Sequence, residues 1–157
     1  RTLTETSFTI NTPFNDPDIF VYIGTYSGTT FYVAPNGSDD IGNGSENNPF
    51  ATIQTAIDSS SNGDTILVAI GTYFDNLIVI QDVLIQGVSA DSTFLYRDQD
   101  YNAVVTIQSS CHIKNMSIIG EGEGNIIQIE SGSPVLRNNI LTLQTEYGEG
   151  NSIINCS

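Results

Sequence analysis

A repeat of 22 to 26 residues after position 102 constrains the fold of this chain more than any other feature. The first copy reads AVVTIQSSCHIKNMSIIGEGEG (103–124), the second reads NIIQIESGSPVLRNNILTLQTEYGEG (125–150), and NSIINCS begins a third. A repeat this short cannot bury its apolar face alone, so successive copies must stack. Equivalent positions align between the copies: Val105 with Ile127 and Ile153, Ile107 with Ile129, Ile113 with Leu136, Lys114 with Arg137, and Asn115 with Asn138.

Strands that recur once in each repeat predict a parallel β-helix. In such a stack each strand pairs in parallel with its counterpart about 4.8 Å away, and the connection rule favours right-handed coiling. The runs before the repeat keep the same pattern of β-branched residues broken by Gly, Asn, Asp and Ser: DTILVAIGTY, NLIVIQDVLIQG and STFLY. The expected fold is all-β, a short right-handed parallel β-helix of about four to five coils.

One helical segment, PFATIQTAIDSSSNG, precedes these strands. Asn48 is the predicted N-cap, Pro49 suits the first turn, and Gly63 ends the segment. We therefore expect a helix near 49–61 that caps the N-terminal side of the β-helix, since soluble solenoids cover their ends. Its apolar residues fall on one helical face: Phe50, Ile53, Ala56 and Ile57.

Residues 1–30 do not follow the repeat. They contain an alternating apolar stretch, a turn with proline, and a second strand around Ile19 to Ile23. We interpret them as an added β arm. The expected organisation is an arm at 1–30 and a β-helix domain at 31–157.

Residues 31–87 contain a series of short motifs: Tyr32-Val33, the loop Pro35 to Asp39, the run Pro49 to Gln54, Gly63-Asp64-Thr65 and Gly71-Thr72-Tyr73. Together these motifs resemble the opening of right-handed β-helix proteins of the pectate-lyase-like superfamily. Ser-Pro-Val-Leu-Arg-Asn-Asn at 133–139 is similar to the coil of the same family, so the resemblance extends over about 31–157. It implies the fold; some members are polysaccharide lyases or hydrolases, but the matched motifs are structural ones.

Charge and composition narrow the class of partner. The net charge is -14, with four basic residues against eighteen acidic ones, so the chain lacks the cations that neutralise a run of phosphates. This excludes nucleic acid as a partner. Charged residues make up 14% of the chain, so Ser, Thr, Asn, Gln and Gly must form much of the surface, which is typical of secreted β proteins.

Further features favour an extracellular location. The chain opens at Arg1 rather than Met, which suggests that an export segment has been removed. No apolar run approaches the roughly 20 residues that span a bilayer. We expect a secreted protein without a membrane span, glycosylated most readily in the 36–45 loop. Its Asn-X-Ser sequons begin at Asn36, Asn43, Asn115 and Asn155.

Two basic residues are the candidates for catalysis. A polysaccharide lyase of this superfamily needs a Lys or Arg base beside acidic residues that hold calcium against the sugar. Lys114 and Arg137 fall on adjacent coils, where they would contact an acidic sugar, but no cluster of aspartates is in register with them. The pattern favours a surface role over catalysis for both residues.

Acidic residues offer other kinds of site. The loop NGSDDIGNGSENN places Asp39, Asp40 and Glu46 among oxygen-bearing side chains that suit calcium. Its role as the turn before the helix is favoured, so we expect no cofactor, with calcium as the alternative. His112 has no second ligand at metal spacing. Further carboxylates could pair for glycoside hydrolysis or bind a cation, but they lie in polar turns, so the interpretation as solvated turn residues is favoured over both. These residues are Asp98, Asp100, Glu121, Glu123, Glu146 and Glu149.

The two cysteines, Cys111 and Cys156, are predicted to stay unpaired within the chain. In the repeat Cys156 aligns with Glu130 and, two coils below, with Gln108, which lies close to Cys111 in sequence. Two coil spacings exceed the Cα separation of about 7 Å that a disulfide spans.

The ends of the predicted solenoid suggest self-assembly. The helix covers one end, whereas NSIINCS stops in mid-coil, so Ile153 and Ile154 would lie at an open edge. The arm residues Leu3, Phe8 and Ile10 form an alternating strand that would complete this edge in a neighbouring molecule. Such heterologous contacts propagate into filaments. We expect a subunit of an extracellular fibre or surface layer; the alternatives are a carbohydrate-binding module and, less favoured, a lyase-like enzyme.

Overall fold

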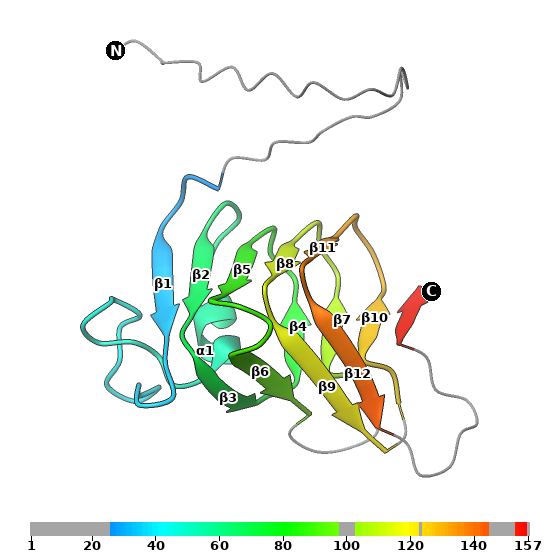
Figure 1. The fold of residues 1–157 in the computed structure, drawn as a ribbon. Helices are drawn as coiled ribbons and strands as arrows, with labels where there is room; N and C mark the ends of the chain where they lie inside the picture. The colour runs from blue at the N-terminus through cyan, green and yellow to red at the C-terminus, as the bar shows by residue number, and fades with distance from the viewer. Residues whose placement is uncertain (1–25, 98–102, 123, 145–152, 157) are drawn as a thin grey trace, which may run out of the picture.

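The chain winds through three parallel β-sheets that enclose one core (Figure 1). The computed structural model describes residues 26–97, 103–122, 124–144 and 153–156. The first sheet contains, in spatial order, β1 (Thr30–Val33), β2 (Thr65–Val68), β5 (Leu84–Gly87), β8 (His112–Lys114) and β11 (Val135–Arg137). The second contains β3 (Gly71–Phe74), β6 (Thr93–Tyr96), β9 (Ser117–Glu121) and β12 (Ile140–Gln144). The third contains β4 (Leu77–Val79), β7 (Val105–Ile107), β10 (Ile127–Ile129) and β13 (Ile154–Cys156).

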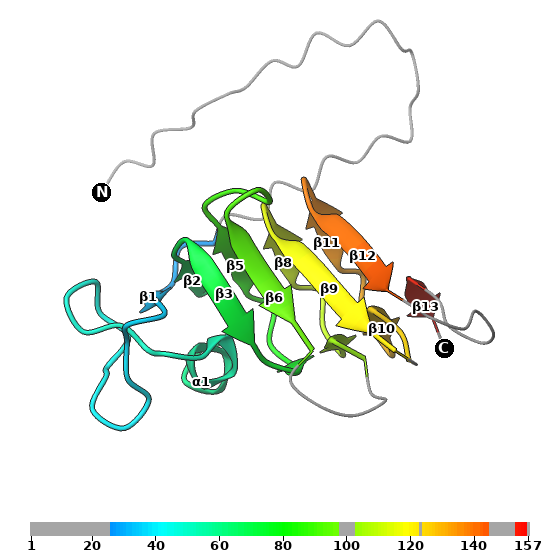
Figure 2. The same ribbon diagram turned by 60° about the horizontal axis from the view of Figure 1, so that its bottom comes forward.

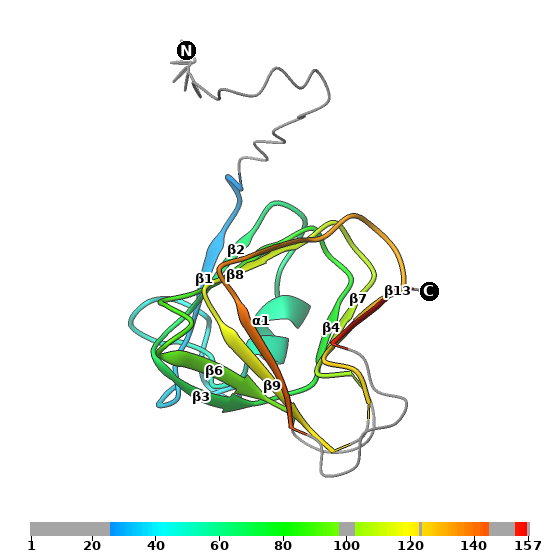
Figure 3. The ribbon, with the colours of Figure 1, turned by 45° about the vertical axis from the view of Figure 1, so that its right-hand side comes forward.

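Successive strands pass from one sheet to the next, so the chain coils round a common axis (Figure 3). One coil is β2–β3–β4, and the last coil is β11–β12–β13. Strands make up 44% of the structure and helix 5%, in a solenoid of about three turns. The predicted all-β parallel β-helix is confirmed. The strands from β2 to β13 form four coils of three, in agreement with the four to five coils expected, and about three turns lead from the first coil to the last. β1 adds one strand to the first sheet alone.

The register predicted from the repeat is confirmed in the middle coils and wrong in the last. Val105 pairs with Ile127, and Lys114 pairs with Arg137, as expected. Ile154, not Ile153, is the partner of Ile127. Adjacent isoleucines offer two registers one residue apart, and the hydrogen bond from Ile127 N–H to the Ile153 carbonyl (2.9 Å) selects one of them.

The core is built from inward-facing ladders with one residue from each strand. Alternate residues of a strand point to opposite faces, so each strand gives one or two side chains to the core. β-Branched residues recur at these positions because they pack well on a pleated surface. Ladders that are at most 1% exposed lie in each sheet in turn: Ile66–Ile85–Ile113, Leu95–Ile118 and Val79–Ile107.

The helix is shorter than predicted and begins later. α1 spans Ile53–Asp58, and its N-cap is Thr52 rather than Asn48. The chain just before Thr52 is not helical, because Phe50 bridges in parallel to Val33 of β1. The backbone of this segment is therefore committed to pairing with the sheet and cannot form the first helical turn that the proline suggested.

The helix also ends before Gly63. Its C-cap is Ser59, whose N–H donates to carbonyl oxygens of the last turn. The predicted range of 49–61 is therefore wrong at both ends, but the predicted role holds. The buried residues Ile53, Ala56 and Ile57 place α1 over the N-terminal side of the coils (Figure 2). Among the described residues no helix has the length and apolarity needed to cross a membrane.

Two aspartates of the opening motifs hold this region together. Asp39 accepts hydrogen bonds from the backbone N–H groups of Ala51 and Thr52 (2.8 and 3.1 Å), which fixes the start of the helix. Asp64 is buried and accepts from the N–H of Thr29 (2.6 Å), which ties the chain before β1 to the chain before β2. These motif residues have structural roles.

Candidate assembly surface

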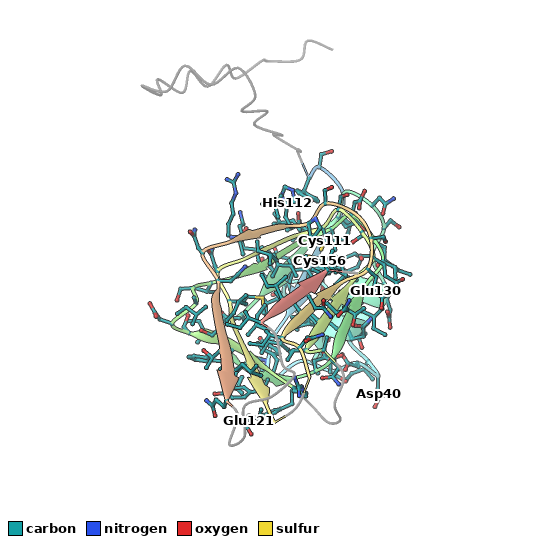
Figure 4. All side chains as sticks on the ribbon, turned by 90° about the vertical axis from the view of Figure 1, so that its right-hand side faces the viewer. Asp40, Cys111, His112, Glu121, Glu130 and Cys156 are labelled. Carbon is teal, nitrogen blue, oxygen red and sulfur yellow. The ribbon has the colours of Figure 1, made fainter. Side chains whose placement is uncertain are left out.

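The last coil has the least covered apolar side chains of the solenoid's core ladders. Leu141 and Leu136 are only partly buried, although the residues one coil before them, Ile118 and Ile113, are at most 1% exposed. Ile140 and Ile154 are 47% and 43% exposed. Figure 4 faces this end of the molecule, with Cys156 of β13 near its middle. The chain thus presents an apolar cross-section here.

The opposite end of the solenoid is closed. α1 covers the core there, and the loop before it shields the free side of β1. The N–H of Tyr32 in β1 donates to the Gly44 carbonyl (2.8 Å), and the Phe50 N–H donates to the Tyr32 carbonyl (3.0 Å). The backbone of β1 is therefore paired on both sides, with β2 and with this loop.

At the open end, β11 directs backbone groups away from the protein. The N–H of Val135 donates to the Cys111 carbonyl (2.9 Å), and the Asn115 N–H donates to the Arg137 carbonyl (3.2 Å). Backbone groups of a strand alternate between its two neighbours. The N–H and C=O of Leu136 therefore face the side that lies away from β8, where another strand can bind.

The predicted assembly residues fall in two parts of the chain. Ile153 and Ile154 lie in the last coil that the structure describes, and their side chains are 47% and 43% exposed. Leu3, Phe8 and Ile10 lie outside the described residues, as does most of the predicted arm. Its boundary at residue 30 moves, because Thr30 already belongs to β1.

Residues 26–29 cross the corner at which the strands of the first sheet begin. The N–H of Gly28 donates to the carbonyl of Gly63 (2.9 Å), just before β2. The ring of Tyr26 meets the ring of His112, the first residue of β8, edge to face, with centroids 5.1 Å apart. The chain thus passes β2 and β5 to reach β8 in a few residues.

Tyr26 is partly buried in this corner. Burial raises the pKa of its phenol to about 12, and the negative charges of Cys111 and Asp82 add to the shift. The sequence repeat offers no signal for this contact, because Tyr26 belongs to no repeat. Figure 4 labels Cys111 and His112 near each other at this corner.

The two cationic candidates lie side by side on the outer face of the first sheet. Lys114 and Arg137 pair in register across β8 and β11, as predicted. His112 lies on the same face, and its pKa is lowered mainly by burial, with Arg137 and Lys114 contributing. Arg97 is used differently: its guanidinium donates to the carbonyls of Glu121 and Asn125 (both 3.0 Å).

The acidic candidates do not converge on a metal site in the part of the chain that the structure describes. No group of three or more His, Cys, Asp or Glu side chains there could hold a metal ion. Asp39 is engaged by the backbone at the helix start, whereas Asp40 and Glu46 are exposed. Glu121 is exposed at the end of β9. Candidates outside the described residues are Asp98, Asp100, Glu123, Glu146 and Glu149.

The glycosylation sequons differ in accessibility. Asn36, Asn43 and Asn155 are exposed. Asn115 has a left-handed backbone (φ 60°) and accepts a hydrogen bond from the side chain of Asn138 (3.4 Å). The serine of its sequon, Ser117, is buried. The Asn115 sequon is thus part of a structural corner.

Both cysteines are free, as predicted. Cys111 is buried, and burial raises its pKa to about 11. Cys156 is exposed at the end of β13. Its partner in β10 is Ile129, not the predicted Glu130, which follows from the one-residue change of register.

Comparison with known proteins finds no relative. No family model matches the chain, and no curated protein or solved structure matches it. The functional argument therefore depends on the geometry of the chain itself.

Proposed function

We propose that this chain is a structural subunit that assembles head to tail. The N-terminal arm of one molecule adds a strand to the last coil of the next. The observation that carries this proposal is the contrast between the two ends: one is covered by α1 and a paired loop, the other presents Leu136, Leu141 and Ile154. A contact between unlike surfaces does not close on itself and propagates into a filament.

The proposal includes an extracellular fibre or surface layer and membership of the pectate-lyase-like superfamily. The low content of charged residues, 14% of the chain, supports the extracellular location. The motifs at residues 31–87 support the membership of the superfamily. Asp39 and Asp64 of those motifs serve the fold, as the resemblance implies. Exposed sequons at Asn36 and Asn43 are the glycosylation sites of this proposal.

Light scattering and electron microscopy on the full chain test assembly. We expect particles much heavier than the monomer, and Ile154→Asp to abolish them by placing a charge on the open end. Ile78→Asp is the matched control, because Ile78 is also exposed (53%) but lies on β4, far along the third sheet. Phe8→Asp tests the arm. A full chain that stays strictly monomeric at every concentration overturns the proposal.

A second candidate is binding of an acidic polysaccharide. The observation in its favour is that Lys114 and Arg137 are adjacent on one outer face of a chain with net charge -14. Polyuronate retardation in native gels tests it: Lys114→Ala and Arg137→Ala should weaken binding, and Lys114→Arg should preserve it. Unsaturated products from a polyuronate incubated with the protein and calcium would extend this function to a lyase. A protein that no polyuronate retards would exclude the binding function.

A further inference from the structure

The outer face of the first sheet carries one row of side chains that crosses all five strands. The strand register pairs each member of this outer row with the next. The row consists of Tyr32 in β1, Leu67 in β2, Gln86 in β5, Lys114 in β8 and Arg137 in β11. Its members point away from the core because their strand neighbours Ile66, Ile85 and Ile113 are buried. The outer row thus follows the solenoid axis for four strand spacings, or about 19 Å (Figure 1).

Positive charge is gathered at one end of the outer row. The structure describes three basic residues. The guanidinium of Arg97 donates to the carbonyls of Glu121 and Asn125 (both 3.0 Å), away from this face. The other two, Lys114 and Arg137, belong to the outer row and are partly and fully exposed. None of the five strands of the sheet contains an acidic residue, so the row ends in two cations in a chain of net charge -14.

The other end of the outer row borders a hollow that carries a negative charge. This hollow of about 510 Å³ lies where β1, β2 and β5 end, and it is lined by Tyr32, Leu67 and Gln86 of the row. Glu46, from the loop before α1, is the only charged side chain among the described residues that line it, and it is exposed. Val88, also in the lining, is 59% exposed. This end therefore combines one carboxylate with exposed apolar surface.

The strand order makes this face complementary to the same face of a second copy. β5 is the third of the five strands, with β2 and β1 on one side of it and β8 and β11 on the other. A two-fold axis parallel to β5 therefore places β11 of one copy over β1 of the other, and β8 over β2. Gln86 of β5 then meets Gln86 of the second copy, and each amide can both donate and accept a hydrogen bond.

Each charged contact in this arrangement is between unlike groups and occurs twice. Arg137 of one copy faces Glu46 and Tyr32 of the other, which offer a carboxylate for an ion pair and a ring on which a guanidinium stacks. The aliphatic stem of Lys114 lies over Leu67 of the other copy. A two-fold axis along the solenoid would instead place Lys114 and Arg137 against the same residues of the second copy, which repel. The charges thus select the axis parallel to β5.

We propose that the outer faces of two first sheets bind each other about a two-fold axis parallel to β5, with Arg137 of each copy against Glu46 of the other. The strands of the face cover about 19 by 13 Å, or roughly 250 Å² per copy, against about 800 Å² in a standard interface. The contact is therefore weak. In a filament it recurs at every subunit, so that many weak contacts join filaments side by side into a layer. This last step rests on the proposed assembly function, whereas the contact between two copies does not.

Sedimentation equilibrium of the full chain up to millimolar concentration tests this contact. The Ile154→Asp background removes the proposed head-to-tail contact, so that the remaining association is lateral. We expect an equilibrium between monomer and dimer that Arg137→Glu and Glu46→Arg each weaken about tenfold or more, because each variant places two like-charged pairs in the dimer. Glu46→Arg makes the chain less negative, so general repulsion between acidic molecules predicts the opposite result for this variant.

A mixture of the two single variants tests the pairing itself. In the mixed dimer the new carboxylate at position 137 faces the new guanidinium at position 46, and the other contact keeps the original Arg137 and Glu46. Both contacts attract, so the mixture should recover the original dissociation constant to within about threefold. Glu121→Arg is the matched control, because it changes the charge by the same amount at the end of β9, on the side of the molecule opposite to His112 (Figure 4). It should not weaken the dimer.

The results separate this contact from the other functions proposed for the chain. A strictly monomeric chain at millimolar concentration overturns the contact, as does a mixture that fails to recover association or equal weakening by Glu121→Arg. Polyuronate binding that Arg137→Glu abolishes, in a chain that never dimerises, assigns the face to a polysaccharide and also overturns it. A dimer in a chain that never forms larger particles supports the contact while contradicting head-to-tail assembly.

Discussion

The same ladders of core residues reach both ends of the described solenoid, but the two ends differ in how well other residues cover these ladders. At the N-terminal end Phe50 and Ile57, which belong to no repeat, cover the core, and they are 6% and 0% exposed. At the other end Leu141 continues the ladder of Leu95 and Ile118 but is only partly buried. Each repeat presents an apolar face on which a further repeat can stack, so covering the end of a solenoid requires residues that depart from the repeat pattern. The predictions below test this difference in order of expected effect.

The largest effect is expected from two leucines on one ladder. Leu95→Ala creates a cavity in a filled coil and should lower the free energy of unfolding by about 2 to 5 kcal/mol. Leu141→Ala, two strands along the same ladder, should cost only about 1 kcal/mol because its site is partly open. Urea denaturation measures both. Equal losses would mean that the last coil is packed as tightly as the middle one.

The two thiols should differ in reactivity by about 100-fold. Cys156 is exposed, whereas Cys111 is buried and has a pKa raised to about 11, so little thiolate forms near neutral pH. Alkylation of the native protein followed by mass spectrometry should find label on Cys156 alone. The Cys156→Ser variant should take up no label until the chain is unfolded; rapid native labelling of this variant would show that the coil around Cys111 opens.

The closure of the N-terminal end should depend on Asp64. Asp64→Ala removes the acceptor for the N–H groups of Thr29 and Ser61 and should cost about 1 to 3 kcal/mol of unfolding free energy. Asp40→Ala, an exposed aspartate in the same region, should change it by less than about 0.5 kcal/mol. Thermal and urea unfolding measure both, and a neutral Asp64 variant would contradict this account of the closed end.

The smallest effect is expected on the pKa of His112, the first residue of β8, which pairs with β11. The pKa of His112 is lowered from 6.5 by burial and by Arg137 and Lys114. The folded protein binds this proton less tightly than the unfolded chain, so the full stability contribution is present above pH 6.5 and is lost as the pH falls. Arg137→Gln should raise the pKa of His112, as followed by NMR titration; an unchanged pKa would mean that β11 is not held in this register.

Much of the fold was predictable because the sequence repeat shows which residues occupy equivalent positions in successive coils. Ladder positions such as Ile113 and Leu136 recur at a constant offset, and stacking then follows from the need to bury them. The range of the helix was not predictable from periodicity, since the pairing of Phe50 with Val33 competes with helix formation at its start. The register of β13 failed for a related reason: Ile153 and Ile154 are both apolar, and only hydrogen bonding distinguishes them.

The candidate surface was predicted less well. The pairing of Lys114 with Arg137 followed from the alignment of the repeats. The contact of Tyr26 with His112 was beyond sequence reasoning, because the two residues are far apart in the chain and share no pattern. Such a contact between a repeat and a segment outside it depends on how the side chains fit together in three dimensions, and the period of the repeat carries no information about that fit.

The path of residues 26–29 has a consequence for how such a protein can change in length. Coils contact only their neighbours, so gene duplication can add one with little disturbance to the rest. A coil inserted between β2 and β8 would carry His112 about 4.8 Å farther away, and Tyr26 would lose its partner. A coil inserted after β8 would leave that contact intact. The contact of Tyr26 with His112 therefore fixes the number of coils between β2 and β8. Insertion of a coil is least constrained on the C-terminal side of β8.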